Sequence, residues 1–212
     1  MTVIKGYCHI NKEDCWVNGK PVLAKTDDPE YSWLRQIYNF VGLSYPKFHK
    51  MDQLAQAGVL ALALLKHEGD LPMDYSEEGV DLVLANRHAS AGSDLRFQAS
   101  YADHAAPSPA LFVYTLPNIV LGEIAIQQKW YGDHIFVVLP AFDPDFFIQY
   151  AQRHIQQGCQ AVIGGWLEVT DTETDVFLFL AEAEESTGKG GSLPLAAINE
   201  LYRQPMPSIS KL

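Results

Sequence analysis

Cysteine is scarce in this sequence. Only Cys8, Cys15 and Cys159 occur among 212 residues, an odd number without paired spacing. A disulfide framework is therefore not expected, because such frameworks use an even set of cysteines in a short chain. Cys8 and His9 are neighbours in an apolar run that predicts a strand, so their side chains point to opposite faces and cannot form a metal site with Cys15. We predict no bound metal.

Long apolar runs and a secretory leader are also missing. The longest apolar run, residues 58–65, is too short to cross a bilayer. The first five residues lack the charged and apolar regions of a signal peptide. We therefore expect a cytoplasmic protein without a membrane span.

Positive charge is in deficit. Lys and Arg number 15 against 26 Asp and Glu, which gives a net charge of −11. Such a field repels phosphate backbones, so nucleic acid is not an expected partner. The hydrophobic share of 48% is typical of a globular domain.

Strand and helix patterns alternate along the chain. Strands are predicted at 3–10, 80–85, 135–139, 160–169 and 175–183, helices at 28–41, 52–66, 118–128, 143–157 and 195–203, and a loop at 92–108. The run 135–139 is apolar throughout, which is typical of a central parallel strand covered on both faces. The turn before the last strand is too short for a crossover, so that strand is antiparallel. We predict an α/β fold with a mostly parallel five-stranded sheet and helices on both faces.

Two Asp-Pro sequences are predicted to begin helices. Asp28 and Asp143 would each cap a helix whose first turn holds the proline. Gly42 and Gly158 would end these two helices.

Three other sequence patterns do not predict a site. The run 187–191 has a Gly-Lys-Gly sequence without the spacing of a phosphate-binding loop, so a surface loop is expected. Ser90 and Ser93 lie near His88 but lack the glycines of a nucleophile elbow, which predicts a loop role. The seven histidines show no metal-ligand spacing and are expected mostly at the surface or at sheet edges.

A series of short motifs resembles the β-ketoacyl synthases. In chain order they are Lys50-Met51-Asp52, Ser108-Pro109, Thr115-Leu116-Pro117-Asn118, Gly122-Glu123, Gly132-Asp133 and Ala161–Gly165. The resemblance covers residues 1–185, about the N-terminal half of a synthase. It implies a thiolase-like α/β/α layered half-fold for 1–185, with 186–212 a loop, short helix and tail packed on the same domain. It also implies that subunits pair through the strand at 135–139.

The nucleophile of that family is missing here. Counting from Gly132 puts Ala141 at the position of the family's catalytic cysteine, flanked by Pro140 and Phe142. None of these side chains can attack a thioester. The family's two malonyl-binding histidines belong to the half that has no counterpart in this sequence. The resemblance therefore implies a chain that is inactive alone and uses no cofactor.

One apolar stretch is the candidate interface. It comprises Phe112, Val113, Tyr114, Thr115, Leu116, Pro117 and Asn118. In the family, side chains from this region reach across the dimer and wall the partner's acyl tunnel, and the resemblance implies that role here. Trp130, Tyr131 and Phe142 are further interface candidates. The alternative is ordinary core before a helix.

The resemblance implies a non-catalytic, chain-length-factor-like subunit that pairs with a full-length ketosynthase in fatty acid or polyketide-type biosynthesis. The small synthase-like proteins of aryl polyene and flexirubin-type pathways are the most similar in character. Without a second half, the chain should expose an apolar surface for its partner. An acidic acyl carrier protein would dock on the partner, not on this acidic chain. Two alternatives stay open: an acyl-binding homodimer, and a stand-alone enzyme that uses Asp143.

Overall fold

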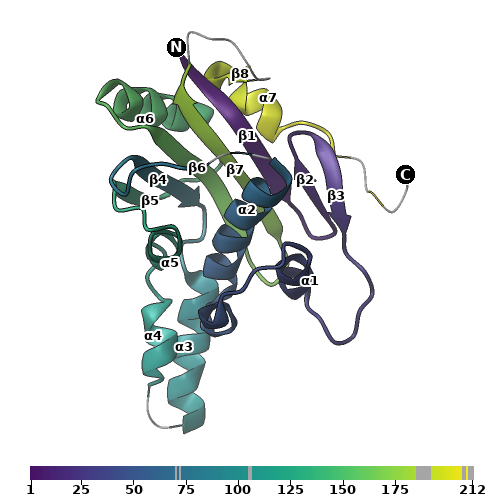
Figure 1. The fold of residues 1–212 in the computed structure, drawn as a ribbon. Coiled ribbons are helices and arrows are strands. Elements are labelled where there is room, and N and C mark those ends of the chain that lie inside the picture. The colour runs from purple at the N-terminus through teal and green to yellow at the C-terminus, as the bar shows by residue number, and fades with distance from the viewer. Residues whose placement is uncertain (70, 72, 105–106, 185–191, 207–208, 210–212) are drawn as a thin grey trace.

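The fold is built on one mixed sheet (Figure 1). The computed structural model describes residues 1–69, 71, 73–104, 107–184, 192–206 and 209. The predicted strands are β1 (Thr2–Ile10), β4 (Val80–Asn86), β5 (His134–Val138), β6 (Ala161–Val169) and β7 (Thr174–Ala183). Their order in the sheet is β1-β7-β6-β4-β5, in which β5, β4 and β6 are parallel and β7 is antiparallel to both β6 and β1. Among the five predicted strands, four run in one direction and β7 is reversed, as predicted. The described sheet as a whole has eight strands, and most of its pairings are antiparallel.

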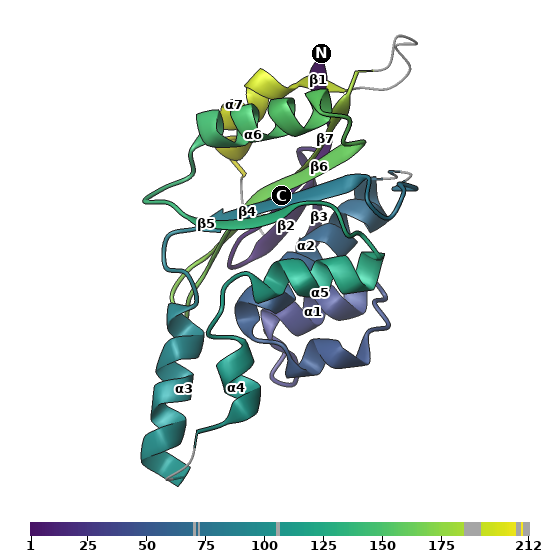
Figure 2. The same ribbon diagram turned by 90° about the vertical axis from the view of Figure 1, so that its left-hand side faces the viewer.

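Helices cover both faces of the sheet, which confirms the layered α/β/α fold (Figure 2). On one face lie α1 (Trp33–Phe40), α2 (Gln53–Gly69) and α5 (Ile119–Gln128). On the other lie α6 (Pro144–Gln156) and α7 (Ile198–Tyr202). Side chains alternate along the strands, so they fill two separate apolar clusters, one under each helical layer. In the described ranges, no helix combines the length and hydrophobicity that crossing a bilayer requires.

A hairpin extends the sheet beyond β1. It consists of β2 (Asp14–Val17) and β3 (Lys20–Ala24), and β2 pairs with β1. Asn18 and Gly19 between them both have positive φ, the geometry of a type I′ turn. The Asn-Gly sequence is a strong hairpin signal that the five-strand prediction did not include.

The two Asp-Pro predictions have different outcomes. Asp143 caps α6, because its side chain accepts hydrogen bonds from the backbone N–H groups of Asp145 and Phe146. The prediction for Asp28 is wrong: its carboxylate accepts from Glu30 and Tyr31 in a local turn, and α1 begins only after Ser32. The same local hydrogen bonds that cap a helix can close an isolated turn.

The predicted loop at 92–108 is wrong. It contains most of α3 (Ala91–His104) and is followed by α4 (Pro109–Val113). The two helices form an arm that projects away from the sheet (Figure 2). Ser93 and Ser100 are the buried side chains among those described on α3, so the helix lacks the apolar stripe by which a helix is recognised in a sequence.

The C-terminal part packs on the same sheet as the rest of the chain. β8 (Leu193–Pro194) pairs with β1, and Leu195 and Ile198 are buried in the cluster beneath α6. Leu195 belongs to a short 3-10 helix, η2 (Leu195–Ala197), that precedes α7. The Gly-Lys-Gly run at 187–191 lies outside the described residues.

The expectation that the histidines lie mostly at the surface or at sheet edges is met by His49, His67, His88 and His134, but His9 is buried. Its side chain is buried in β1 at 3% exposure, and Nε2 lies 3.1 Å from the carbonyl oxygen of Leu201. Burial lowers the pKa of His9 from 6.5 to about 4, against the opposing effect of the Leu201 carbonyl. The folded protein therefore holds His9 neutral at neutral pH.

We expect stability to fall as the pH drops from 6.5 towards 4. In this window the unfolded chain binds a proton at His9 that the folded chain does not, so the free energy of unfolding decreases with acid. The loss at pH 4.5 from this group alone is about 2 kcal/mol. Urea unfolding at pH 7 and pH 4.5 measures it, and His9→Gln, which keeps a donor for Leu201, should lose less. Equal losses in the two proteins contradict the assignment.

Candidate functional site

The loop between β5 and α6 holds the position that the resemblance assigns to the nucleophile. Ala141 and Pro140 are exposed there. Phe142 is half-buried and stacks on Tyr202 of α7, with ring centroids 4.1 Å apart, and on Phe147 of α6 at 5.2 Å. Tyr202 is itself fixed by a 2.6 Å hydrogen bond from its hydroxyl to Asp175. The loop thus presents no thiol or hydroxyl, and an aromatic stack fills the space beside it.

Asp143 is the one ionisable side chain of this loop, and its contacts are those of a helix cap. Its Oδ1 accepts from the N–H of Asp145 at 3.0 Å and of Phe146 at 3.2 Å. The stand-alone enzyme that would use Asp143 gains no support from this geometry.

We expect Asp143→Ala to lower the free energy of unfolding by about 1 kcal/mol, because an N-cap acceptor is removed. Asp143→Asn should change it little, since asparagine caps equally well. Urea titration of the two variants measures the difference. If Asp143→Asn instead kept its stability but abolished a turnover of the isolated chain, the enzyme alternative would replace the cap assignment.

β5 is an edge strand, and the prediction of a central strand covered on both faces is wrong for this chain. Leu82 donates its N–H to the carbonyl of Asp133, and Leu139 donates to Asn86 on β4. Backbone groups alternate in direction along a strand, so the odd-numbered residues of β5 face β4 and the even-numbered ones face outward. His134, Phe136 and Val138 therefore present their N–H and C=O groups at the open edge. Among the described residues, no strand pairs with the five-residue, largely apolar β5 on this side.

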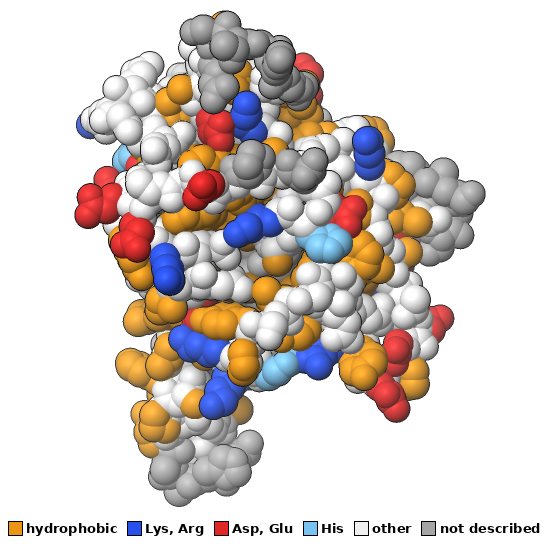
Figure 3. Space-filling model, viewed as in Figure 1, with side chains coloured by type: hydrophobic (Ala, Val, Ile, Leu, Met, Phe, Trp, Pro, Cys, Tyr) orange, Lys and Arg blue, Asp and Glu red, His pale blue; other side chains and the backbone are white. Residues whose placement is uncertain are grey.

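Exposed apolar side chains gather around this edge. They lie on the α3–α4 arm, on α5, on β5 and in the adjoining loops: Leu95, Tyr101, Phe112, Val113, Leu116, Ile126, Tyr131, Ile135 and Val138. In the space-filling view hydrophobic side chains mark the left-hand side, over α5 and the arm (Figure 3). We call this surface the β5 face. Phe112 at 55% and Leu116 at 51% are too exposed to be core residues.

The candidate stretch 112–118 is anchored by its one buried member, Tyr114. The Tyr114 hydroxyl donates to Glu123 of α5 at 3.3 Å, and Glu123 is only 3% exposed. Lys47 pairs with the same carboxylate at 2.8 Å, and the Tyr45 hydroxyl also donates to it. Burial, followed by the charge of Glu123, raises the pKa of Tyr114 to about 12, so this hydroxyl stays a donor. The buried Tyr114 thereby fixes the backbone of the stretch, and the other side chains of the stretch extend from it towards the surface.

The outer surface of α6, which lies on the other side of the sheet from α5, is polar. On α6 the exposed positions are Asp145, Gln149, Gln152, Arg153 and Gln156. The apolar surface expected from the missing second half is therefore not found on this helix. Of the two further interface candidates that follow α5, Tyr131 is 56% exposed on the β5 face, whereas Trp130 is core at 3%.

Three residues that the sequence analysis did not connect meet at the opposite end of the strands. Asp81, Asp133 and His154 bring possible metal-ligand atoms within 4.8 Å of one another. Both oxygens of Asp81 are already occupied, one by the N–H of Asp133 at 2.8 Å and the other by Nδ1 of His154 at 2.6 Å. The cluster is explained as a satisfied hydrogen-bond network that joins β4 to α6. Its members are far apart in the sequence, so no spacing signal could have found it.

Comparison with known proteins defines the class of fold. No protein-family model matches the chain, and no curated protein matches its sequence. Solved structures do match. The ishigamide ketosynthase/chain length factor matches with a TM-score of 0.65 and 18% identity over 88% of this chain. A ketosynthase in complex with its chain length factor from Xenorhabdus doucetiae matches with a TM-score of 0.55 and 15% identity over 88%. A type II polyketide synthase acyl-carrier protein in complex with its ketosynthase matches with 0.53 and 11% over 85%.

The chain therefore has the thiolase-like fold of ketosynthases and chain length factors, as the motif resemblance predicted. It spans 63%, 81% and 62% of the length of those three matched chains. At these identities the likeness is one of fold.

Proposed function

We propose that the chain is a non-catalytic, chain-length-factor-like subunit that pairs through its β5 face with a complete ketosynthase. The observation that carries this proposal is the open edge of β5. An unpaired, uncharged strand edge is a template for pairing with another chain, and stable monomers usually protect such edges. Here the edge adjoins the exposed apolar side chains of the arm.

The contents of the β5–α6 loop support the non-catalytic part of the proposal. Acyl transfer by nucleophilic catalysis needs a thiol, a hydroxyl or a comparable group at the mouth of the strand. The loop offers Pro140, Ala141 and Phe142, with Phe142 held in an aromatic stack. Condensation would then occur on the cysteine of the partner.

The stretch 112–118 would act as the tunnel wall in this assembly. Phe112, Val113 and Leu116 are exposed on the β5 face, and Tyr114 fixes their position through Glu123. Their size would set how much room the partner's acyl chain finds. Solved pairs of a ketosynthase with its chain length factor and a type II polyketide synthase complex share the fold of this chain, which supports a polyketide-type or fatty-acid-type pathway. The aryl polyene type is proposed on the motif resemblance.

Co-expression with a full-length ketosynthase encoded beside it tests the proposal. We expect a stable heterodimer in size-exclusion chromatography, and no covalent acylation of the isolated chain by an acyl thioester. A stable homodimer with bound lipid would favour the acyl-binding alternative, and elongation by the isolated chain would end the non-catalytic assignment.

A further inference from the structure

A pocket of about 230 Å³ opens at the carboxyl ends of β4 and β6. After β4 the chain continues to β5 on one side, and after β6 it continues to β7 on the other. In open α/β sheets, ligands bind outside the carboxyl ends of the strands, which is where this pocket lies. The pocket is lined by residues that follow both strands, among them 88–93 and 169–172, and by 52–54 at the start of α2.

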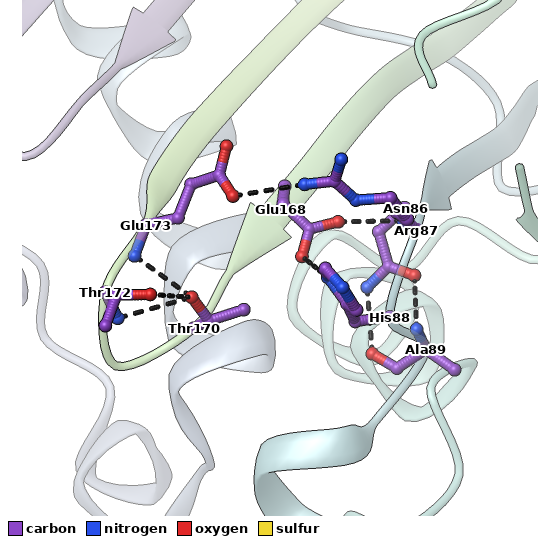
Figure 4. A network of polar contacts seen from close by, with 8 residues as sticks. All are labelled: Asn86, Arg87, His88, Ala89, Glu168, Thr170, Thr172 and Glu173. Carbon is purple, nitrogen blue, oxygen red and sulfur yellow. Dashed lines mark hydrogen bonds and ion pairs between the residues drawn. The ribbon is translucent and has the colours of Figure 1, made fainter. Parts of the chain in front are cut away.

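A histidine in this pocket is oriented by a buried acid (Figure 4). Nδ1 of His88 lies 2.6 Å from Oε1 of Glu168, whose side chain is 1% exposed. Glu168 is held in turn by the backbone N–H of Arg87, at 2.8 Å. Because a carboxylate only accepts, Nδ1 carries the hydrogen, and Nε2 is the ring nitrogen left for a ligand.

The loop that carries His88 is fixed in a strained form. The Asn86 side chain donates to the carbonyl of Ala89 and accepts from its N–H, both at 2.8 Å. Ala89 has φ +49, an unfavourable value for a residue with a Cβ. Such strain persists only where the surroundings enforce it, and it concentrates at functional sites. Asn86 is 2% exposed, so a buried side chain serves to hold this turn.

The remaining walls indicate what the pocket would take. Leu54, Leu95 and Val169 supply apolar contacts, and the first turn of α3, at Gly92, brings the positive end of a helix to the wall. Asp52 and Asp171 also line the pocket, opposed by one cation, Arg96. An anionic ligand would meet net repulsion from these groups and from Glu168, so a neutral molecule with a short apolar part fits best.

We propose that His88, positioned by Glu168, is the general base of a second site that hydrolyses esters of short, neutral acyl groups. Nε2 accepts a proton from water as the water oxygen bonds to the acyl carbon. The bond from carbon to the leaving oxygen or sulfur then breaks, and the proton passes from the imidazolium to the leaving group. Glu168 acts throughout as a positioning residue that accepts the hydrogen bond from Nδ1. Leu95 belongs both to this pocket and to the β5 face, so the site is tested on the chain alone.

Hydrolysis of p-nitrophenyl acetate by the full chain alone tests this site. We expect His88→Gln to lower kcat about 100-fold or more, the usual contribution of a general base. Glu168→Gln should lower kcat at least about tenfold with KM unchanged, because the base is misoriented while the pocket remains. The octanoate ester should be a poorer substrate than the acetate, since its chain exceeds the pocket.

His67→Gln is the matched control. His67 also places Nδ1 near a carboxylate, at 2.8 Å from Glu68, and its side chain is 48% exposed, as is that of His88. His67 does not line the pocket, so its variant should stay within about twofold of the natural rate. Two results would contradict the proposal: a wild-type rate no greater than that of equimolar free imidazole, or equal losses of rate in the His67 and His88 variants. In either case the hydrogen bond between His88 and Glu168 would have a structural role only. Thermal unfolding shows whether Glu168→Gln is folded. If it is not, His88→Gln alone tests the proposal, because the His88 side chain is half-exposed and its replacement should not unfold the protein.

Discussion

Val138→Pro should separate this chain from its partner without unfolding it. The N–H of Val138 faces the open edge of β5 and the side chain is 55% exposed, so the monomer loses no contact with β4. In a paired edge, proline removes one ladder hydrogen bond and its ring obstructs the incoming strand. The unpaired acceptor left on the partner costs about 1–3 kcal/mol, roughly 5- to 150-fold in Kd. Size-exclusion chromatography and calorimetry with the co-expressed ketosynthase measure the effect.

Neighbouring substitutions supply the controls for this experiment. Val138→Thr keeps the N–H and a β-branched side chain, so the pair should survive. Val137→Pro removes an N–H that faces β4 and should destabilise the monomer itself by about 3 kcal/mol. If Val138→Pro binds the ketosynthase as tightly as the natural chain, β5 is not the pairing edge.

Gly164→Ala should be among the most destabilising single substitutions in the protein. Gly164 lies opposite Phe179 in the β6–β7 ladder, and a Cβ at this position would overlap Cζ of that ring. Phe179 is fully buried between the strands and α6, so the ring has no free space to enter. Overpacking of this kind costs about 3 kcal/mol, which urea unfolding would detect.

The double variant Gly164→Ala with Phe179→Leu tests the assigned cause. A smaller side chain opposite the alanine should recover at least about 1 kcal/mol relative to the sum of the two single changes. Gly122→Ala in α5 is the matched control, because a Cβ there meets no atom within 4 Å. That variant should gain about 0.5–1 kcal/mol from helix propensity. Additive losses in the double variant would show that the Phe179 ring is not the obstacle.

Local patterns predicted much of this fold correctly. The cap at Asp143 and the last two antiparallel strands depend on neighbouring residues, and the structure contains both. The edge position of β5 could not be read in the same way, because an apolar strand looks alike whether it is covered by its own chain or by another. The arm was missed for a related reason, since α3 has little of its own chain to pack against.

The candidate sites show the same division. Ala141 could be placed between β5 and α6 by counting along the sequence. The pair of His88 and Glu168 could not, because the two residues are 80 positions apart and meet only when β4 and β6 lie side by side. The pocket forms because β4 and β6 are neighbours in the sheet, and the order of the strands cannot be predicted from short stretches of one sequence.

The place of β1 in the sheet sets the order in which the protein can be completed. Thr2, near the beginning of β1, pairs with Ala183 at the end of β7, so two segments far apart in the sequence lie side by side. A ribosome must release β7 before this ladder can close, and such distant pairing slows folding. During synthesis β4, β5 and α6 can already associate while β1 waits for its neighbour. The β5 edge can therefore form before the ladder between β1 and β7 closes.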